Sequence, residues 1–487
     1  MLPGVTKPIP TVPTVRRAKI VCTIGPAVAT KEGIRDLVDA GMDVARLNFS
    51  HGTHQEHSAA IRLIRAASDE SGRAVCVLGD LQGPKIRLGN FAEDRVEWLA
   101  GELVTITTED VVGTAMRVST TYARFADEVT VGQNVLIDDG RLLLTVEEIV
   151  GPDVRCRVIE GGPVSNHKGI SIPGAALSLE ALTQKDVRDL IFGLRMGIDM
   201  VALSFVRSPD DIGAVHAVMR GAGGERLPVI AKLEMPEAVA RLDEIINAFD
   251  GVMVARGDLG VELPLEEVPI VQKRAIDRCR VMAKPVIVAT QMLDSMVTEP
   301  RPTRAEASDV ANAVLDGADA LMLSAETSVG KHPIDAVKVM ARIISSVEHS
   351  ERRAPALRSE PSTKPGAIAA AAVRIGETLD VRAIVPFTQT GDTARRISRH
   401  HPSFPILAFT PMPRVRSQLA LTWGVETFLL PPVTHTDQMV REVDRALLSI
   451  RRFAPGEEIV IVAGSPPGTA GTTNALRVWT MGGPLPQ

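Results

Sequence analysis

Short apolar runs recur along the chain, and most of them are followed by stretches with helical periodicity. The runs are continuously apolar, whereas a strand exposed on one face would alternate apolar and polar residues. Continuous apolar strands that alternate with helices are typical of a parallel sheet covered on both faces. Eight runs fit this description: 18–24, 43–49, 74–80, 199–205, 228–234, 251–256, 285–291 and 318–326.

The number of repeated units bears on how the sheet closes. Eight strand–helix units predict an α/β protein with a closed (β/α)₈ barrel. A doubly wound open sheet remains the structural alternative. Helices are expected between the strands, for example over 268–283 and 302–317. In the second of these, Pro302 and Thr303 suit a helix start and Gly317 suits a stop.

The strand–helix pattern is interrupted between about residues 84 and 180. Segments there alternate apolar and polar residues and are punctuated by Gly and Asp, which indicates antiparallel strands. We therefore expect a small β-barrel domain inserted after the third strand. It would lie at the carboxyl-terminal mouth of the main barrel, where it could close over a ligand.

The pattern changes again after about residue 350. A charged stretch rich in Pro and Ser, ERRAPALRSEPSTKPG, precedes renewed alternation of helix and strand. This predicts a separate C-terminal α/β domain. The expected organisation is a tail over 1–16, a barrel over 17–83 and 181–349, an inserted β lid over 84–180 and an α/β domain over 350–487.

Composition narrows the class of protein. The chain has 487 residues, of which 45% are hydrophobic, enough for a large core. Its 54 Lys and Arg and 59 Asp and Glu give a net charge of −5, and 3% of its residues are aromatic. Nucleic-acid binders are usually basic and stack bases on aromatic rings, so nucleic acid is not an expected partner.

Cysteines and the N-terminal residues bear on location. The four cysteines, Cys22, Cys76, Cys156 and Cys279, are far apart and form no CxxC pair. Buried thiols in a reducing compartment are the expected state. The N-terminal stretch has prolines and no apolar signal-peptide core, and no apolar run reaches membrane-spanning length. A cytoplasmic protein without membrane contact is therefore expected.

Polar residues stand at or just beyond the carboxyl end of most of the predicted strands. In a barrel these ends share one rim, where barrel enzymes place their active sites. Turn chemistry explains one such residue, but it does not readily explain charged groups at so many strand ends. The residues are Arg46, Asn48, Ser50, Asp80, Ser204, Lys232, Glu234, Arg256, Asp258, Thr290, Gln291, Ser324 and Glu326.

The residue types at this rim indicate a kind of chemistry. Glu234 and Asp258 supply hard carboxylate oxygens without a nearby cysteine pair or histidine cluster, so Mg²⁺ or Mn²⁺ fits better than zinc. Arg46 and Lys232 would face that metal and suit a ligand that carries phosphate and carboxylate groups. Gly257 would let such a ligand approach the backbone closely. Together these groups are the equipment of phosphoryl transfer, which depends on positioning and charge neutralisation.

Other motifs are expected to have simpler roles. His51, His54 and His57 in SHGTHQEH are expected to be neutral and exposed on the first turns of a helix, not metal ligands. The DDG at 138–140 is expected to be a hairpin turn and nothing more. Neither GxxxxGK[ST] nor GxGxxG occurs, so a nucleotide would not be held by a P-loop or a Rossmann turn.

Six segments of the chain resemble the motifs of pyruvate kinase. The resemblance extends over nearly the whole chain, including the inserted and C-terminal domains. AKLE followed by MVARGDLG and ATQMLDSM, in this order, is highly specific. The segments are ARLNFSHGTH (45–54), GPKIR (83–87), AKLE (231–234), VARGDLGVELP (254–264), ATQMLDSM (289–296) and LSAET (323–327).

The resemblance implies an activity and the groups that carry it. Pyruvate kinases move a phosphoryl group from phosphoenolpyruvate to ADP, with Mg²⁺ or Mn²⁺, and the remaining enolate is protonated to pyruvate. At matching positions, Arg46 and Lys232 would bind the phosphoryl group, and Lys232 would stabilise it in flight. Glu234 and Asp258 would hold the metal ion on the substrate side.

The same resemblance implies how the rest of the substrate is held. The backbone amides of Gly257 and Asp258, together with Thr290, would orient the substrate carboxylate. Thr290 and Ser324 resemble the groups near the proton that is delivered to the enolate. Arg256 would support this loop and, in the family, lies at a contact between subunits.

Two further sites follow from the resemblance rather than from residue chemistry. The family's nucleotide site corresponds to Asn48, His51, Arg87 and Lys168. Its monovalent-cation site corresponds to Asn48, Ser50, Asp80 and the carbonyl of Leu81.

Lys85 departs from the pattern of the potassium-requiring members, which have Glu at this position. Leu81 and Gln82 also replace the Thr and Lys that are usual there. A surface lysine in a turn is the simpler interpretation. The joint change favours a functional one, in which the Lys85 ammonium takes the place of K⁺ and K⁺ is not required.

The family also implies regulation and assembly. It binds phosphorylated effectors in the C-terminal domain and forms homotetramers. Here AMP or a sugar phosphate is the expected kind of effector. A second glycine-rich loop, AGSPPGTAGTTN (463–474), lies in the same domain. The expected effector residues, at a predicted strand-to-helix junction with hydroxyls suited to anions, are Thr388, Gln389, Thr390, Gly391, Asp392 and Thr393.

Two other functions remain open from the sequence. A metal-dependent lyase of the pyruvate-enolate type would share the Glu234 and Asp258 pair, but it would not need Lys232, the lid or a nucleotide. A catalytically inactive binding or regulatory protein is the other alternative. The intact set of Lys232, Glu234, Asp258 and Thr290 argues against it.

Overall fold

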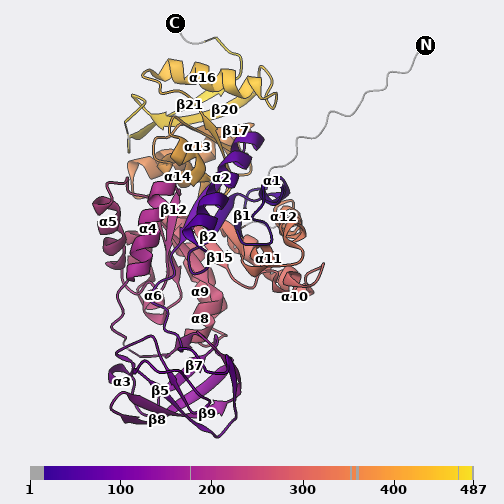
Figure 1. Ribbon diagram of the computed structural model, residues 1–487. Coiled ribbons are helices and arrows are strands. Elements are labelled where there is room, and N and C mark those ends of the chain that lie inside the picture. The colour runs from indigo at the N-terminus through magenta and orange to yellow at the C-terminus, as the bar shows by residue number, and fades with distance from the viewer. Residues whose placement is uncertain (1–15, 176, 351–353, 358–360, 470, 485–487) are drawn as a thin grey trace, which may run out of the picture.

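A computed structural model describes residues 16–175, 177–350, 354–357, 361–469 and 471–484. Residues 1–15 of the expected tail lie outside this part of the chain, as do 351–353 and 358–360 of the linker. Figure 1 shows the described chain as three bodies in a row, with the inserted β domain at the bottom, the barrel in the middle and the C-terminal domain at the top.

The central body is a closed ring of eight parallel strands in the order β1-β16-β15-β14-β13-β12-β3-β2. The predicted (β/α)₈ barrel is therefore confirmed, and the open-sheet alternative is wrong. Every predicted apolar run contains one of these strands. They are β1 (Lys19–Thr23), β2 (Val44–Asn48), β3 (Cys76–Asp80), β12 (Met200–Leu203), β13 (Val229–Leu233), β14 (Gly251–Ala255), β15 (Val286–Ala289) and β16 (Ala320–Leu323).

Helices cover the outside of the ring. They are α1 (Lys31–Ala40), α2 (His54–Ser71), α4 (Gln184–Met196), α5 (Asp211–Gly221), α6 (Pro236–Ala240), α7 (Leu242–Ala248), α8 (Arg256–Glu262), α9 (Val268–Met282), α10 (Arg304–Asp316), α11 (Ala325–Ser328) and α12 (Pro333–Glu348), with a 3₁₀ turn η1 (Asp294–Val297).

The ends of α10 show how the sequence sets a helix boundary. The Thr303 hydroxyl accepts a hydrogen bond from the Glu306 amide, and the Glu306 carboxylate accepts one from the Thr303 amide, which makes a reciprocal capping box. Gly317 ends the helix in the left-handed region at φ 98°. The predicted start at Thr303 and stop at Gly317 are both confirmed.

We expect Thr303→Ala to lower the free energy of unfolding of the barrel by about 1 kcal/mol, because the Glu306 amide loses its acceptor. Urea unfolding measures the effect. Thr378→Ala, in the exposed last turn of the helix Lys364–Leu379 of the C-terminal domain, is the matched control and should be neutral or slightly stabilising. Equal effects of the two substitutions would contradict the capping role.

Alternate residues of the barrel strands face the inside of the ring. Val44, Leu78, Met253 and Ile287 belong to one buried inner cluster, whereas their neighbours pack outward against the helices. Leu421, in the 3₁₀ turn η2 (Leu419–Leu421) of the C-terminal domain, joins the inner cluster. That domain therefore covers the amino-terminal foot of the barrel and leaves the carboxyl-terminal rim to the lid.

The inserted domain, here called the lid, leaves the barrel after β3 and returns to it before α4, as expected for an insertion after the third strand. It has a six-stranded sheet in the order β11-β7-β8-β9-β5-β6 and a two-stranded sheet of β10 and β4 around one apolar core. Its elements are β4 (Arg95–Trp98), β5 (Leu103–Thr107), β6 (Arg117–Ser119), α3 (Phe125–Glu128), β7 (Asn134–Ile137), β8 (Leu142–Val150), β9 (Asp153–Glu160), β10 (Gly162–Ser165) and β11 (Ile170–Ser171).

The C-terminal domain has the predicted α/β pattern. Its sheet has the order β19-β18-β17-β20-β21, with β21 antiparallel to β20. Helices α13 and α14 pack on one face and α16 on the other. The elements are α13 (Lys364–Leu379), β17 (Ala383–Pro386), α14 (Asp392–Ser398), β18 (Ile406–Thr410), α15 (Pro413–Gln418), β19 (Val425–Leu429), α16 (Thr436–Ser449), β20 (Glu458–Gly464) and β21 (Thr473–Thr480).

All four cysteines are buried and unpaired, as predicted. Burial raises the pKa of the Cys156 thiol to about 12, so it stays protonated at neutral pH. Among the described helices, none combines the length and the apolar character that crossing a membrane requires.

Candidate active site

The rim of the barrel becomes polar because inward-facing positions change character near the strand ends. On β13, Ile230 belongs to the inner apolar cluster, and Lys232 follows two residues later on the same face. On β2, Val44 is followed by Arg46, and on β3, Leu78 is followed by Asp80. Alternation along parallel strands therefore brings these charged side chains together at one level of the barrel.

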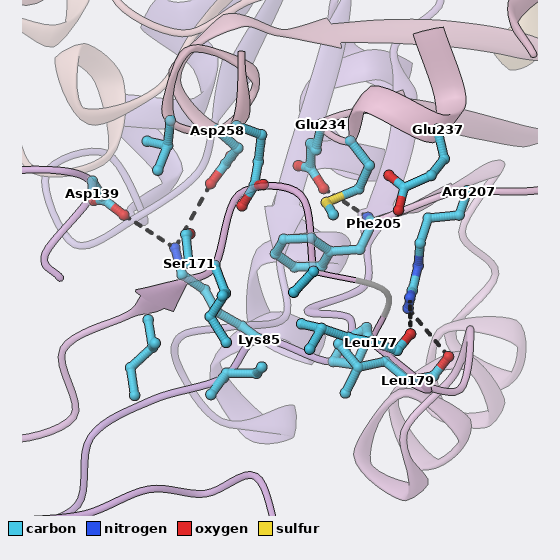
Figure 2. A pocket seen from close by; sticks show the side chains of 18 residues that line it. Lys85, Asp139, Ser171, Leu177, Leu179, Phe205, Arg207, Glu234, Glu237 and Asp258 are labelled. Carbon is cyan, nitrogen blue, oxygen red and sulfur yellow. Dashed lines mark hydrogen bonds and ion pairs between the residues drawn. The ribbon is translucent and has the colours of Figure 1, made fainter. Parts of the chain in front are cut away.

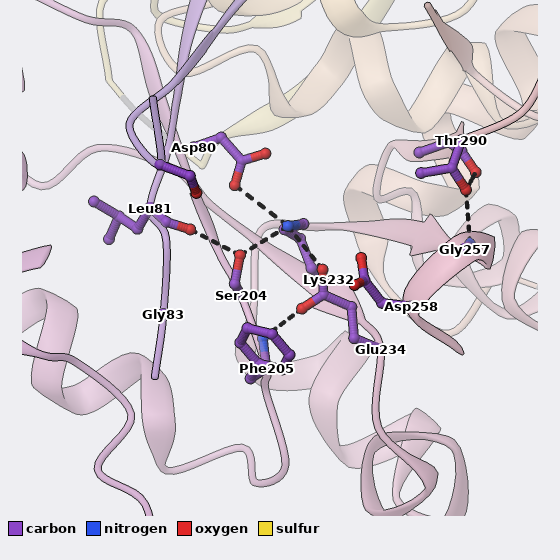
Figure 3. Close-up of polar contacts among 12 residues, drawn as sticks. Asp80, Leu81, Gly83, Ser204, Phe205, Lys232, Glu234, Gly257, Asp258 and Thr290 are labelled. Carbon is purple, nitrogen blue, oxygen red and sulfur yellow. Dashed lines mark hydrogen bonds and ion pairs between the residues drawn. The ribbon is translucent and has the colours of Figure 1, made fainter. Parts of the chain in front are cut away.

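Lys232 is the centre of this group (Figure 3). Its Nζ lies 2.7 Å from Glu234 Oε1 and 3.5 Å from Asp80 Oδ1, and it donates a 2.7 Å hydrogen bond to Ser204 Oγ. Although burial alone would lower it, the Asp80 and Glu234 carboxylates hold the pKa of the Lys232 ammonium above its usual value. The lysine is therefore a permanent, positioned positive charge.

Arg46 provides a second fixed cation beside it. Its Nε donates to Asp80 Oδ2 at 2.6 Å, and its Nη1 donates to the Thr23 hydroxyl at 3.0 Å. Burial opposes ionisation of Asp80, but Lys232 and Arg46 keep its pKa below the usual range. Within the described chain, Asp80 Oδ1 is buried without a hydrogen bond at normal distance and lies 3.5 Å from Lys232 Nζ, so this carboxylate mainly orients the two cations toward the rim.

Glu234 and Asp258 are the two carboxylates expected to hold a metal ion. Glu234 Oε1 pairs with Lys232, and its Oε2 accepts a 2.7 Å hydrogen bond from the Phe205 amide. Burial, with a further contribution from the Asp258 charge, raises the pKa of Glu234 despite the opposing lysine. The side chain of Asp258 is 35% exposed. A buried carboxylate beside a second acidic group favours a bound cation.

The donor set fits a divalent ion held by few protein groups. Within the described residues, no group of three or more His, Cys, Asp or Glu side chains gathers as a protein-only metal cage would. Mg²⁺ commonly takes one or two carboxylates and completes its coordination with water and substrate phosphate. Glu234 and Asp258 fit that pattern, and the residues around them do not fit zinc.

The segment after β14 begins a short helix at once, rather than the turn that Asp and Gly suggest. Gly257, in α8, donates its amide proton to Thr290 Oγ1 at 2.7 Å, and Thr290 Oγ1 donates to the Ala289 carbonyl at 2.6 Å. Arg256 Nη2 donates to the Thr290 carbonyl at 2.7 Å, and Arg256 Nη1 pairs with Asp309 at 2.8 Å. Arg256 therefore supports the loop that carries Thr290.

Thr290 has a backbone conformation that side chains rarely adopt. Its φ is 71°, and that of the following Gln291 is 52°. A β-branched residue at positive φ is an outlier that persists only where the surroundings enforce it, and such residues cluster at functional sites. Phe205, whose amide binds Glu234, also has a positive φ of 55°. Sequence patterns gave no sign of this strain.

Ser324 and Glu326 stand at the end of β16 but differ in role. The Ser324 hydroxyl is buried without a hydrogen-bond partner among the described residues. Glu326 accepts hydrogen bonds from the Ser324 and Leu293 amides, at 2.6 and 3.1 Å, and is 1% exposed. Ser324 is therefore available to a ligand, whereas Glu326 holds the backbone of the rim.

A cavity open to solvent lies between the rim and the lid (Figure 2). Lys85 Nζ lies 3.3 Å from Asp139 Oδ1 on the lid and 3.7 Å from Asp258 Oδ1 on the barrel. Lys168, on the lid, pairs with Asp138 at 2.8 Å. The DDG segment forms the predicted hairpin turn between β7 and β8, and its two aspartates also form these ion pairs.

Arg207 holds the chain where it returns from the lid. Its guanidinium donates to the carbonyls of Leu177 and Leu179, at 2.7 and 3.1 Å, and lines the same cavity.

Glu262 also lines this cavity. Burial raises the pKa of the Glu262 carboxyl to about 7, and its hydrogen bond with Ser171 of the lid opposes the rise. Neither Arg207 nor Glu262 was singled out from the sequence, because each acts through a segment distant in the chain.

The oxygens expected at the monovalent-cation site are largely engaged by donors of the chain itself. Asn48 Oδ1 accepts from the Ser50 amide at 3.1 Å, and the Leu81 carbonyl accepts from Ser204 Oγ at 2.7 Å. Asp80 pairs with Arg46, as described above. The Ser204 hydroxyl accepts a hydrogen bond from Lys232 and donates one to the Leu81 carbonyl. The sequence did not predict this connection.

The expected nucleotide contacts lie around the first turn of α2 and the lid. Burial and the nearby Arg87 and Arg46 charges lower the pKa of His51, so this exposed imidazole stays neutral. Arg87 Nη1 donates to the His167 carbonyl at 2.9 Å.

The expectation of an exposed His57 is wrong, because the residue is 8% exposed and its Nε2 lies 2.9 Å from the His51 carbonyl oxygen. His54 Nε2 lies 2.7 Å from Asp189 Oδ1.

The two glycine-rich loops of the C-terminal domain line one hollow of about 380 Å³. Thr393 Oγ1 lies 2.6 Å from Thr473 Oγ1 across it, and the Gly391 amide donates to Thr388 Oγ1 at 2.9 Å. Asp392 pairs with Arg396 at 2.7 Å. The described residues that line the hollow include neither Lys nor Arg. The expected effector residues Thr388, Gln389, Thr390, Asp392 and Thr393 all line it, and Gly391 lies between them.

Comparison with known proteins agrees with this site. The family model for the pyruvate kinase barrel domain matches residues 15–337, and that for the pyruvate kinase alpha/beta domain matches 366–479. A pyruvate kinase of Mycobacterium intracellulare is 61% identical over 96% of this chain and 99% of its own length, and one of Mycobacterium tuberculosis is 60% identical over the same shares. A crystal structure of a pyruvate kinase from Cryptosporidium parvum superposes with a TM-score of 0.88, at 35% identity, over 96% of both chains. These relatives favour a phosphotransferase over a lyase or an inactive protein. The chain belongs to the pyruvate kinase family.

Proposed function

We propose that this rim transfers the phosphoryl group of phosphoenolpyruvate to ADP mainly through fixed charges of its own side chains. The observation that carries the proposal is the convergence of Lys232 and Arg46 on Asp80, next to the carboxylates of Glu234 and Asp258. Both cations are at least nine-tenths buried and held by ion pairs, so little reorganisation is needed when charge develops on the transferring group.

In this proposal the side chains divide the work. Arg46 and Lys232 bind the phosphoryl oxygens, and Lys232 follows the group as it moves between two oxygens in line. The backbone amides of Gly257 and Asp258, together with Thr290, orient the substrate carboxylate, and Arg256 holds the Thr290 carbonyl. Glu234 and Asp258 hold Mg²⁺ or Mn²⁺, which when bound neutralises charge on the substrate oxygens.

The remaining proposed roles are delivery of a proton to the enolate and binding of the nucleotide. Thr290 and the Ser324 hydroxyl, which has no hydrogen-bond partner in the described part of the chain, lie at adjacent strand ends, from which a proton can be passed to the enolate. His51, Arg87, Asn48 and Lys168 would contact ADP from the side of α2 and the lid.

We expect Asp258→Asn to raise the Mg²⁺ concentration for half-maximal rate at least about tenfold and to weaken phosphoenolpyruvate binding with it, because one carboxylate then holds the ion. Rates measured against Mg²⁺ at fixed phosphoenolpyruvate give the effect. Asp139→Asn is the matched control, since Asp139 also pairs with Lys85 but lies on the lid. An unchanged Mg²⁺ dependence in Asp258→Asn would place the metal elsewhere.

K⁺ independence is a further part of the proposal. Lys85 Nζ lies within ion-pair distance of Asp258, and most of the oxygens that could hold K⁺ already accept hydrogen bonds. The covalently attached ammonium would supply the positive charge that K⁺ supplies in other members.

Regulation, assembly and location are proposed more generally. The hollow lined by Thr388–Thr393 suits a phosphorylated effector, AMP or a sugar phosphate, bound through hydroxyls and amides. The exposed apolar side chains of Leu265 and Ile270 support association into a homotetramer. A cytoplasmic location is consistent with four buried free thiols.

An assay of pyruvate formation from phosphoenolpyruvate with and without ADP tests the proposed reaction. The kinase releases pyruvate and ATP only when ADP is present. Pyruvate formation at the same rate without ADP would contradict phosphoryl transfer and support hydrolysis or a lyase instead.

A further inference from the structure

Four cationic side chains gather where the C-terminal domain meets the foot of the barrel, at the end opposite the active site. Arg280 lies near the end of α9, Lys284 stands just before β15, and Arg395 and Arg399 lie in and just after α14. They line a small hollow open to solvent, which Asp319, just before β16, also borders. We call them the interface cations.

Two of the interface cations are buried with donors that have no acceptor. Arg280 is 4% exposed and Arg399 is 9% exposed. Within the described residues, Nε of Arg280 and both Nε and Nη2 of Arg399 have no hydrogen-bond partner. Leaving a buried charged donor unpaired is costly, so buried guanidinium groups normally have acceptors.

Four cations and one carboxylate, that of Asp319, line the hollow. No interface cation forms an ion pair within 4.0 Å with a carboxylate of the described chain. The carboxylate of Asp319 accepts hydrogen bonds from the Val286 and Trp423 amides, both at 3.0 Å. Burial and the Arg399 and Arg280 charges lower the pKa of the adjacent His400 to about 4, as expected beside excess positive charge.

Helix capping explains only part of this arrangement. Arg280 Nη2 donates to the Arg399 carbonyl at 3.4 Å, Arg280 Nη1 to the Pro355 carbonyl at 2.9 Å, and Arg399 Nη1 to the Val281 carbonyl at 2.7 Å. Carbonyls at helix carboxyl ends do attract cations. Within the described residues, these contacts leave the three N–H groups named above without acceptors. Lys284 Nζ donates to the carbonyls of Asn247 and Phe249, and Arg395 Nη2 donates to the Thr390 carbonyl at 3.2 Å, so neither cation pairs with a described carboxylate within 4.0 Å.

We propose that the interface cations bind a phosphoryl dianion, as free phosphate or as the phosphate of a small monoester. A phosphoryl group offers at least three strong acceptor oxygens and up to two negative charges, which match several unpaired guanidinium donors and two further cations. No residue lines both this hollow and the one formed by the Thr388–Thr393 loop, although Arg395 also donates to the Thr390 carbonyl, and the hollow lies at the opposite end of the barrel from the rim. The site therefore goes beyond the proposed reaction. A ligand there would bridge α9 of the barrel and α14 of the C-terminal domain.

Equilibrium dialysis of the full-length protein with radiolabelled inorganic phosphate, at constant ionic strength in chloride, tests the site. Lys232→Met serves as the background that weakens phosphate binding at the rim. In that background, adding Arg399→Gln should weaken binding of one phosphate per chain at least about tenfold. Adding Arg382→Gln is the matched control, because Arg382 is an exposed arginine of the same domain paired with Glu457, and it should leave binding unchanged.

A second variant tests the site even if Arg399→Gln disturbs the contact between the C-terminal domain and the barrel. Arg395→Gln removes a partly exposed charge whose hydrogen bond is to the Thr390 carbonyl, and it should also weaken phosphate binding. Displacement of bound phosphate by ribose 5-phosphate would identify a monoester site, and failure to displace would identify a site for the free ion. If folded Arg399→Gln and Arg395→Gln both bind as much phosphate as the background, the inference is wrong.

Discussion

Replacing Lys232 with methionine should reduce phosphoryl transfer from phosphoenolpyruvate to ADP by roughly 10²–10³-fold, or about 3–4 kcal/mol of transition-state stabilisation. The reason is that Lys232 is a buried, permanently charged ammonium held by Asp80 and Glu234, so its charge is in place before the phosphoryl group moves. Methionine has a similar shape and no charge, which isolates the electrostatic contribution.

A second readout separates this role from general damage to the site. Exchange of the methyl protons of added pyruvate with deuterium needs proton transfer but no phosphoryl group, so it should survive better than transfer to ADP. Lys19→Met is the matched control, because Lys19 is a buried lysine whose Nζ donates to the Val425 carbonyl at the foot of the barrel. Equal loss of both activities in Lys232→Met would argue against its role as the phosphoryl cation.

Replacing Lys85 with glutamate should lower the rate in K⁺-free buffer by roughly 10²-fold and create a requirement for K⁺. The substitution removes the ammonium beside Asp258 and adds a carboxylate that can hold a cation. Rescue by K⁺ should be incomplete, because Leu81 and Gln82 are unchanged in the variant and replace the Thr and Lys that are usual in potassium-requiring members. The rate of the variant, measured against K⁺ with tetramethylammonium holding ionic strength constant, gives the effect.

Lys85→Met controls for loss of the charge alone. It should lose activity without a comparable rescue by K⁺, since it supplies no carboxylate. If Lys85→Glu keeps its full rate without K⁺, Lys85 is only a surface lysine in a turn and takes no part in charge neutralisation.

The sequence predicted the features that depend on local pattern. Continuous apolar runs such as 251–256 correspond to barrel strands because buried parallel strands need apolar residues on both faces. The sequence also predicted the polar rim, because the rim is formed by the ends of these strands. Alternate residues of a strand face the same side, so Lys232 faces inward as Ile230 does. Thr303 and Gly317 marked helix ends because capping uses the backbone of the same segment.

What the sequence did not predict depends on contacts between distant segments. Glu326 looks like a rim carboxylate in the sequence, but it binds the Leu293 amide of the neighbouring strand's loop. His57 is buried because its imidazole packs edge-on against Phe49, with ring centroids 5.0 Å apart. Thr290 has a positive φ, and Arg256, distant in sequence, donates to its carbonyl; no local residue preference predicts this conformation.

The central claim is that fixed side-chain charges at the rim, including Lys85, neutralise the transferring phosphoryl group without a bound K⁺. The most direct test is the ADP-dependent rate of the unmodified enzyme in tetramethylammonium buffer free of K⁺ and NH₄⁺, compared with the rate in K⁺ at the same ionic strength. We predict equal rates within about twofold, because added K⁺ then acts only through general screening. Near-complete inactivity without K⁺ would contradict the account.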